Sequence, residues 1–198
     1  VSILDTSVYE DFNIKAIAIS IICKKLFNER VIARKYEEVQ EIEEHYSYFF
    51  TEERKLERPL VWIFIDEAHE LLPKSKRTPA SDILTQLIRE GRQPGISMIM
   101  ATQQPGEIHQ DVITQSDIVI SFRITAEQDI KALNMINQSY LTEQILENMN
   151  NLPKEKGAAI LLDDNSERIY SIKLRPKLSW HSGDTPSAVL FKKELIKI

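Results

Sequence analysis

The stretch Leu60-Val61-Trp62-Ile63-Phe64-Ile65, followed at once by Asp66-Glu67-Ala68-His69, decides the fold of this chain. Six consecutive apolar residues predict a central strand in a sheet that helices cover on both faces. Further apolar runs occur at 96–101, 118–122 and 158–162, and helical segments are expected near 79–89, 125–136 and 142–149. Alternating strands and helices predict an α/β fold with a mainly parallel sheet.

The flanking segments extend this pattern. Val1–Asp5 is expected to form a short strand, and residues 11–27 have apolar side chains at helical spacing. A second helix with a charged, solvated face is predicted from Asn28, running into a loop before Pro59. The helix near 79–89 is predicted to follow Thr78 as its N-cap, with Pro79 in its first position and Gly91 beyond its end.

The carboxyl-terminal part is predicted to contain a hairpin and a tail. Residues 168–174 are expected to pair with 158–162 around the turn Asp163-Asp164-Asn165. We therefore expect one partial domain over residues 1–175, including the helical segment 11–58. A tail over 176–198 is expected to pack on that domain or on a neighbouring subunit.

Composition limits the functions that the chain can have. Its 198 residues are 42% hydrophobic and 28% charged, as in an ordinary globular domain or part of one. The net charge of −5 creates no global basic field, so any contact with nucleic acid must be local or arise when several copies assemble. The only cysteine, Cys23, lies in an apolar run and is expected to be a buried thiol, which fits a cytoplasmic protein. No apolar stretch reaches the roughly 20 residues that a membrane helix needs.

The two acids after the first apolar strand are candidates for catalysis. Ligands bind at the carboxyl ends of strands in parallel sheets, so Asp66 and Glu67 would emerge at a binding site. Asp66 suits Mg²⁺ through bound water, and Glu67 suits activation of a water that attacks a γ-phosphate. The alternative is a plain acidic pair at an exposed strand end.

Polar and basic residues around the next strand support the nucleotide interpretation. Gln103, or otherwise Thr102, follows the strand at 96–101 and would sense the γ-phosphate or orient the water. Arg92, or otherwise Arg89, precedes that strand and is a candidate for acting on ATP bound to a neighbouring subunit. Both arginines also fit an ordinary surface or helix-capping role.

The order and spacing of four blocks resemble the HerA-like family of hexameric DNA-translocating ATPases, a sister group of the FtsK pumps. The blocks are Asp66-Glu67-Ala68-His69-Glu70-Leu71-Leu72-Pro73, Arg89-Glu90-Gly91-Arg92 with Pro94-Gly95, Ala101-Thr102-Gln103-Gln104-Pro105, and Gln115-Ser116-Asp117 with Arg123 after an apolar strand. The segment 174–186 is similar to the end of the family's domain, whereas residues 1–58 match only loosely.

This resemblance implies a RecA-like P-loop NTPase core that uses ATP and Mg²⁺. It implies Asp66 and Glu67 as the Walker B pair, Gln103 as the polar sensor, and Arg92 or Arg89 as the residue acting on a neighbour's ATP. It also implies a hexameric ring that moves along double-stranded DNA in DNA-end processing, with a nuclease as partner.

The phosphate-binding loop of such a core is absent from these residues. No G-x-x-x-x-G-K-[ST] sequence occurs, and none of the five glycines is followed by Lys-Ser or Lys-Thr. We expect the loop to lie upstream of Val1, the alternative being a non-hydrolysing paralogue that acts as an interaction domain. The 198 residues alone are expected to bind ATP weakly and to hydrolyse none.

The partner of the motor is less constrained by sequence. Lys74, Lys76 and Arg77 form a basic cluster, and the loop 106–115 is a second candidate for DNA contact, although solvated loops explain both equally well. A conjugative or type IV secretion-type ATPase remains the alternative motor.

Overall fold

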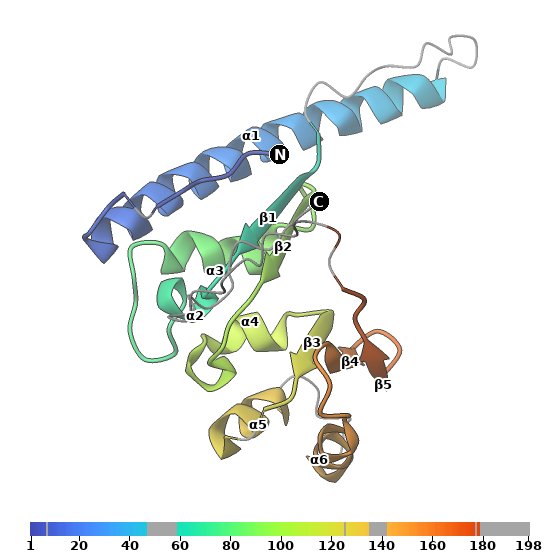
Figure 1. Cartoon of the computed structure of the whole chain (residues 1–198). Coiled ribbons are helices and arrows are strands. Elements are labelled where there is room, and N and C mark those ends of the chain that lie inside the picture. The colour runs from blue at the N-terminus through green and yellow to red at the C-terminus, as the bar shows by residue number, and fades with distance from the viewer. Residues whose placement is uncertain (7, 47–58, 125, 135–141, 177, 179–198) are drawn as a thin grey trace, which may run out of the picture.

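The computed structural model describes residues 1–6, 8–46, 59–124, 126–134, 142–176 and 178 (Figure 1). The amino-terminal half of the described chain contains α1 (Phe12–Tyr46), β1 (Val61–Ile65), α2 (Ala68–Leu71), α3 (Ser81–Glu90) and β2 (Ile96–Met100). The remainder contains η1 (Pro105–Glu107), α4 (Gln110–Thr114), β3 (Ile118–Phe122), α5 (Glu127–Asn134), α6 (Thr142–Asn151), β4 (Ala158–Asp163) and β5 (Arg168–Lys173). The chain therefore mixes helices and strands, and each predicted apolar run from residue 60 onward forms a strand.

Helix α1 is a single long helix. Asp11 caps it, because Asp11 Oδ1 accepts a hydrogen bond of 2.7 Å from the Asn13 backbone N–H. The predicted break near Asn28 is wrong, since no glycine or proline interrupts the sequence between Phe12 and Tyr46. The predicted strand at Val1–Asp5 is also wrong: no strand in the described part of the chain pairs with it, and the Ile3 side chain is exposed.

The strands form two separate sheets. Strands β1 and β2 are parallel, in a register that runs from Val61 opposite Ile96 to Ile65 opposite Met100. Strands β3, β4 and β5 form an antiparallel sheet in which the predicted hairpin of β4 and β5 is confirmed. The described strands are thus not mainly parallel. Helices α2 and α3 lie between β1 and β2, whereas α5 and α6 lie between β3 and β4, and β4 begins beside the end of β3.

The first core lies between one face of the parallel sheet and the helices packed on it. Its fully buried side chains include Leu72, Leu84 and Leu87, and the inward residues of β1 and β2 pack against them. The opposite face of this sheet is open: Trp62 is 61% and Phe64 is 70% exposed. The prediction of a strand covered on both faces is therefore wrong for the described residues, because the described helices pack on one side only.

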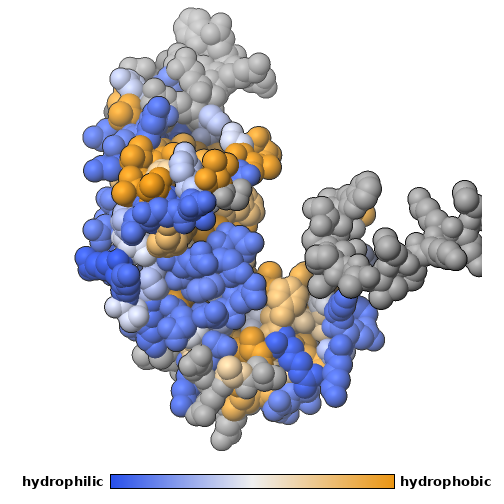
Figure 2. Space-filling view, turned by 60° about the vertical axis from the view of Figure 1, so that its left-hand side comes forward, coloured by the Kyte–Doolittle hydropathy of each residue, from blue (hydrophilic) through white to orange (hydrophobic). Residues whose placement is uncertain are grey.

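Exposed apolar side chains also occur on α1. Figure 2 shows hydrophobic side chains gathered in the upper part of the molecule, which α1 occupies in Figure 1, above a broad hydrophilic area. The exposed apolar residues of α1 are Ile14, Ile17, Ile21, Ile22, Ile32, Tyr36, Val39 and Ile42. In the parts of the chain that the model describes, no helix is both long enough and apolar enough to span a bilayer.

A second core joins the antiparallel sheet to α5 and α6. Ile160 and Leu162 of β4 are almost fully buried against Ile145 and Met149 of α6. The elements of this core lie in the lower part of Figure 1, away from α1.

Two predicted elements differ in the structure, and most of one predicted segment lies outside the described residues. Helix α3 begins at Ser81, so Thr78 is not its N-cap; the Thr78 hydroxyl instead donates to the Leu71 carbonyl at 2.6 Å. The predicted loop 106–115 contains η1 and α4. Nearly all of the predicted tail 176–198 lies outside the described residues.

Candidate active site

The parallel sheet brings the residues after β1 and after β2 together at one edge. The Ala101 backbone N–H donates to the Ile65 carbonyl at 2.8 Å, and the Ala68 N–H donates to the Ala101 carbonyl at 2.9 Å. The strands predicted at 60–65 and 96–101 are therefore neighbours in the sheet. Asp66 and Glu67 consequently lie beside the residues that follow β2.

Glu67 has a backbone conformation that is unusual for a residue other than glycine. Its φ is 47° and its ψ is 47°, in the left-handed region. Such a conformation costs on the order of 1–3 kcal/mol, and residues that adopt it cluster at active sites, ligand clamps and switch regions. Asp66 Oδ1 accepts a hydrogen bond of 2.9 Å from the Glu67 N–H, and α2 begins directly afterwards.

The Glu67 carboxylate contacts a residue from the end of β2 and a residue of α2. Gln103 Nε2 donates a hydrogen bond to Glu67 Oε1. Glu67 Oε2 lies 3.5 Å from Nδ1 of His69, and that ring nitrogen lies 2.9 Å from Oγ1 of Thr102. Glu67 and Gln103, both singled out from sequence, are thus in direct contact 36 residues apart in the chain.

Asp66 is the candidate for contact with a divalent cation. The described residues contain no group of three or more His, Cys, Asp or Glu side chains arranged to hold a metal. Mg²⁺ does not need such a group, because it keeps several waters and takes one or two carboxylates. Asp66 is exposed at the strand end, and its recorded hydrogen bond uses Oδ1 alone, so this carboxylate fits water-mediated contact with Mg²⁺.

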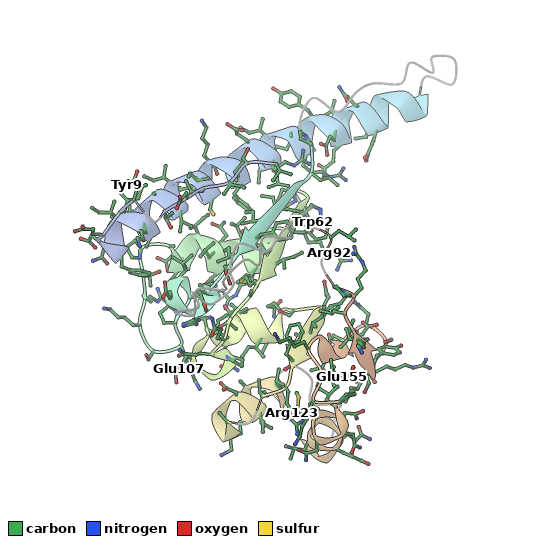
Figure 3. The ribbon with its side chains drawn as sticks, in the orientation of Figure 1. Tyr9, Trp62, Arg92, Glu107, Arg123 and Glu155 are labelled. Atoms are coloured by element: carbon green, nitrogen blue, oxygen red, sulfur yellow. The ribbon has the colours of Figure 1, made fainter. Side chains whose placement is uncertain are left out.

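Arg92 lies in the turn between α3 and β2, at the amino end of the parallel sheet, as Figure 3 shows. Two glycines shape this turn: a Cβ on Gly91 would lie 2.4 Å from the Leu87 carbonyl oxygen, and Gly95 has a φ of +79°. Arg92 is exposed and forms no ion pair with the described residues. Five residues of β2, or about 16 Å, separate this turn from the opposite end of the strand. The structure therefore does not bring Arg92 to Glu67 of its own chain.

Arg89 has a partner within the chain. Its Nη2 lies 2.6 Å from Oδ2 of Asp111, a residue of α4. The Arg89 side chain is 59% exposed and the Asp111 side chain only 17%. The carboxylate is therefore partly buried, whereas much of the Arg89 side chain faces solvent. Arg89 is thus less free than Arg92 to reach another subunit.

The basic cluster lies on a loop that is tied to the segment after β2. The Lys74 N–H donates to the Glu107 carbonyl at 2.7 Å, and the His109 N–H donates to the Leu72 carbonyl at 2.7 Å. The side chains of Lys74, Lys76 and Arg77 are exposed, and Arg77 pairs with Asp82 at 3.2 Å. Backbone hydrogen bonds therefore join the two segments considered for DNA contact, the basic cluster and 106–115.

Three residues of this region had no predicted role. The sequence predicts no role for His69, Asp111 or Arg30. The position of His69 two residues after Glu67 could have indicated a contact between them. The partners of Asp111 and Arg30 lie 22 and 64 residues away, so no local pattern indicates those contacts.

The family model "Helicase HerA-like C-terminal" matches residues 44–160, which is more than half of the chain. The chain belongs to this family. The match contains both acids after β1, both arginines before β2, and Gln103. The family resemblance inferred from sequence is therefore confirmed.

Individual relatives match smaller parts of the chain. A probable DNA double-strand break repair helicase HerA of Methanocaldococcus jannaschii is 28% identical over 46% of this chain and 18% of its own length. The DNA double-strand break repair helicase HerA of Pyrococcus furiosus is 25% identical over 76% of this chain and 27% of its own length. The chain thus spans about a fifth to a quarter of the length of these relatives.

Among solved structures, the genome packaging NTPase B204 of Sulfolobus turreted icosahedral virus 2 in complex with AMP aligns with a TM-score of 0.46. That alignment has 23% sequence identity and covers 57% of this chain and 52% of the viral chain.

Proposed function

We propose that this chain is the Walker B part of a RecA-like ATPase domain in a HerA-type DNA translocase or helicase. The observation that carries the proposal is the direct contact between Glu67, at the end of β1, and Gln103, at the end of the neighbouring parallel strand. Family membership supports the same assignment. The complete protein would then couple ATP hydrolysis to movement along double-stranded DNA.

In this proposal the residues after β1 and β2 divide the hydrolytic work. Glu67 accepts a proton from the attacking water, and Gln103 senses the γ-phosphate or orients that water. Asp66 would hold Mg²⁺ through a bound water, and the ion would neutralise charge that develops on the phosphate oxygens. The 198 residues contain no phosphate loop, so they supply the residues that activate water and not those that bind the ATP phosphates.

Arg92 is proposed to act on the ATP of a neighbouring subunit in a hexameric ring. Its exposed side chain and its position at the amino end of β2, away from Glu67, favour a role between subunits. An arginine placed there stabilises charge on the transferring phosphoryl group. Arg89 is the second choice because Asp111 engages it.

DNA contact is proposed for the exposed loop with Lys74, Lys76 and Arg77. One chain has a net charge of −5, so attraction to phosphates would be local to this loop and would be stronger where several copies of the loop line a common channel. DNA-end processing with a nuclease partner follows from the family resemblance and is part of the same proposal.

The test is Glu67→Gln in the complete protein. We expect ATP binding to remain and turnover to fall by a factor of 100 or more, because an amide cannot accept the proton from water. Steady-state ATPase assays and nucleotide titration measure the two effects. Glu70→Gln, which changes an exposed acid three residues away on α2, is the matched control and should leave both unchanged. Unchanged turnover in Glu67→Gln would point to a non-hydrolysing interaction domain instead.

A further inference from the structure

The two oxygens of the Glu67 carboxylate have different environments. Oε1 accepts a hydrogen bond from Gln103, whereas Oε2 is buried and has no hydrogen bond among the described residues. Leaving a buried acceptor unpaired costs about 1–3 kcal/mol. Nδ1 of the His69 ring lies 3.5 Å from Oε2.

The position of the His69 ring is set by Thr102. Thr102 Oγ1 lies 2.9 Å from His69 Nδ1, and it also accepts a hydrogen bond of 3.0 Å from the Gln104 backbone N–H. The hydroxyl therefore connects the ring to the backbone that follows β2. The His69 side chain is only 16% exposed, so the ring has little freedom to turn into solvent.

The backbone around His69 is equally constrained. Helix α2 contains four residues, and its first N–H, from Ala68, donates to the Ala101 carbonyl at the end of β2. Glu67 has the left-handed conformation immediately before the helix, and its Oε2 lies 3.5 Å from Nδ1 of the ring. Both ends of the Glu67–His69–Thr102 cluster are thus attached to the edge of the parallel sheet.

We propose that His69, with its ring held by Thr102, is the positioning residue that aims the Glu67 carboxylate at the attacking water. The inference rests on the proposed function, and on the alternative within it in which Gln103 senses the γ-phosphate and therefore leaves the Glu67 carboxylate when nucleotide is bound. Of the described side chains that contact the Glu67 carboxylate, His69 is the one that then remains. Thr102, which sequence suggested as a second sensor, acts instead through the imidazole.

The experiment compares ATP turnover by variants of the complete protein. His69→Ala should lower kcat at least tenfold and leave KM for ATP within about twofold. A wrongly oriented Glu67 carboxylate slows the chemical step but does not weaken binding of the ATP phosphates. His69→Asn places an amide nitrogen near the position of Nδ1 and should recover most of kcat. Thr102→Val removes the hydroxyl at nearly equal volume and should also lower kcat, as His69→Ala does.

The double variant tests whether the two residues act as one unit. If Thr102 acts through His69, His69→Ala with Thr102→Val should be no slower than the slower single variant. Multiplicative losses would mean that Thr102 acts on its own, and they would overturn its part of the proposal. Glu70→Gln serves again as the control on the same short helix.

The outcomes separate this inference from the proposed function. If Glu67→Gln abolishes turnover while His69→Ala keeps the original kcat, the positioning role is wrong and the proposed function stands. If Glu67→Gln keeps turnover, the proposed function fails first. A His69→Ala protein that unfolds at lower temperature and loses ATP binding, with His69→Asn and Thr102→Val unchanged in kcat, would show a purely structural role and overturn the inference.

Discussion

Asp163 shows how one side chain can organise a turn. Its carboxylate accepts a hydrogen bond of 2.7 Å from the Ser166 hydroxyl and further hydrogen bonds from the backbone N–H groups of Asn165 and Ser166. The Ser166 hydroxyl is the main cause that lowers the pKa of Asp163, and the two N–H groups act in the same direction. The charged carboxylate is thereby favoured in the folded hairpin of β4 and β5.

The pKa of Asp163 should respond to the loss of that hydroxyl. A pKa lowered by folding means that the carboxylate stabilises the fold above its unfolded pKa of about 3.9, and that this contribution is lost as the pH falls through the folded pKa. Ser166→Ala should raise the pKa of Asp163 toward its usual value, measured by NMR titration of the side-chain carboxyl. Asn165→Ala keeps its backbone N–H and should change the pKa little. An unchanged pKa in Ser166→Ala would contradict the assignment.

At the scale of elements, one buried arginine joins the long helix to the turn that presents Arg92. Arg30 of α1 is 3% exposed; its Nε donates to the Pro94 carbonyl at 2.7 Å, and its Nη1 donates to Glu37 at 3.0 Å. Glycine at 95 is needed here, because a Cβ would lie 3.3 Å from Arg30 Nη2 and the φ is positive. Helix α1 therefore supports the shape of a turn 64 residues away.

Removal of Arg30 should destabilise the chain more than removal of its neighbour Arg34. Arg30→Ala leaves the Pro94 carbonyl without its donor and removes the shorter of the two ion pairs of the partly buried Glu37, and should cost about 3 kcal/mol, at the lower end for breaking a buried ion pair. Arg34 is 34% exposed and pairs with Glu37, Glu38 and Glu41, so Arg34→Ala should cost less than about 1 kcal/mol. Urea unfolding measures both, and equal losses would contradict the role given to Arg30.

At the scale of the whole molecule, the open face of the parallel sheet is the least expected feature. Trp62 and Phe64 of β1 and Ile99 of β2 are exposed on that face beside Leu60, while the residues between them pack inward. Contiguous apolar surface of this kind marks a site of contact or a tendency to associate. The 198-residue chain should therefore bind hydrophobic dyes and associate at high concentration.

Replacing the two aromatic residues tests this expectation. Trp62→Thr with Phe64→Thr keeps residues that favour strands and removes the exposed rings. Dye fluorescence and self-association should fall, whereas the midpoint of thermal unfolding should change little, because neither ring is buried. Unchanged dye binding, or loss of folding, would show that the rings are not exposed as described. Ultracentrifugation and a thermal scan provide both measurements.

The sequence by itself determined the strands, the acids that follow β1 and the family, because each depends on residues close together in the chain. The apolar runs from residue 60 onward correctly predict strands, although the expectation at Val1–Asp5 is wrong, and Asp66 and Glu67 directly follow the first of these runs. Only the tertiary structure decided the antiparallel pairing of β3 with β4 and the open face of the sheet. It also decided that Thr102 faces His69 and that Asp111 engages Arg89. These features depend on side chains 22 or more residues apart, whose meeting is set by how the elements pack and not by local pattern.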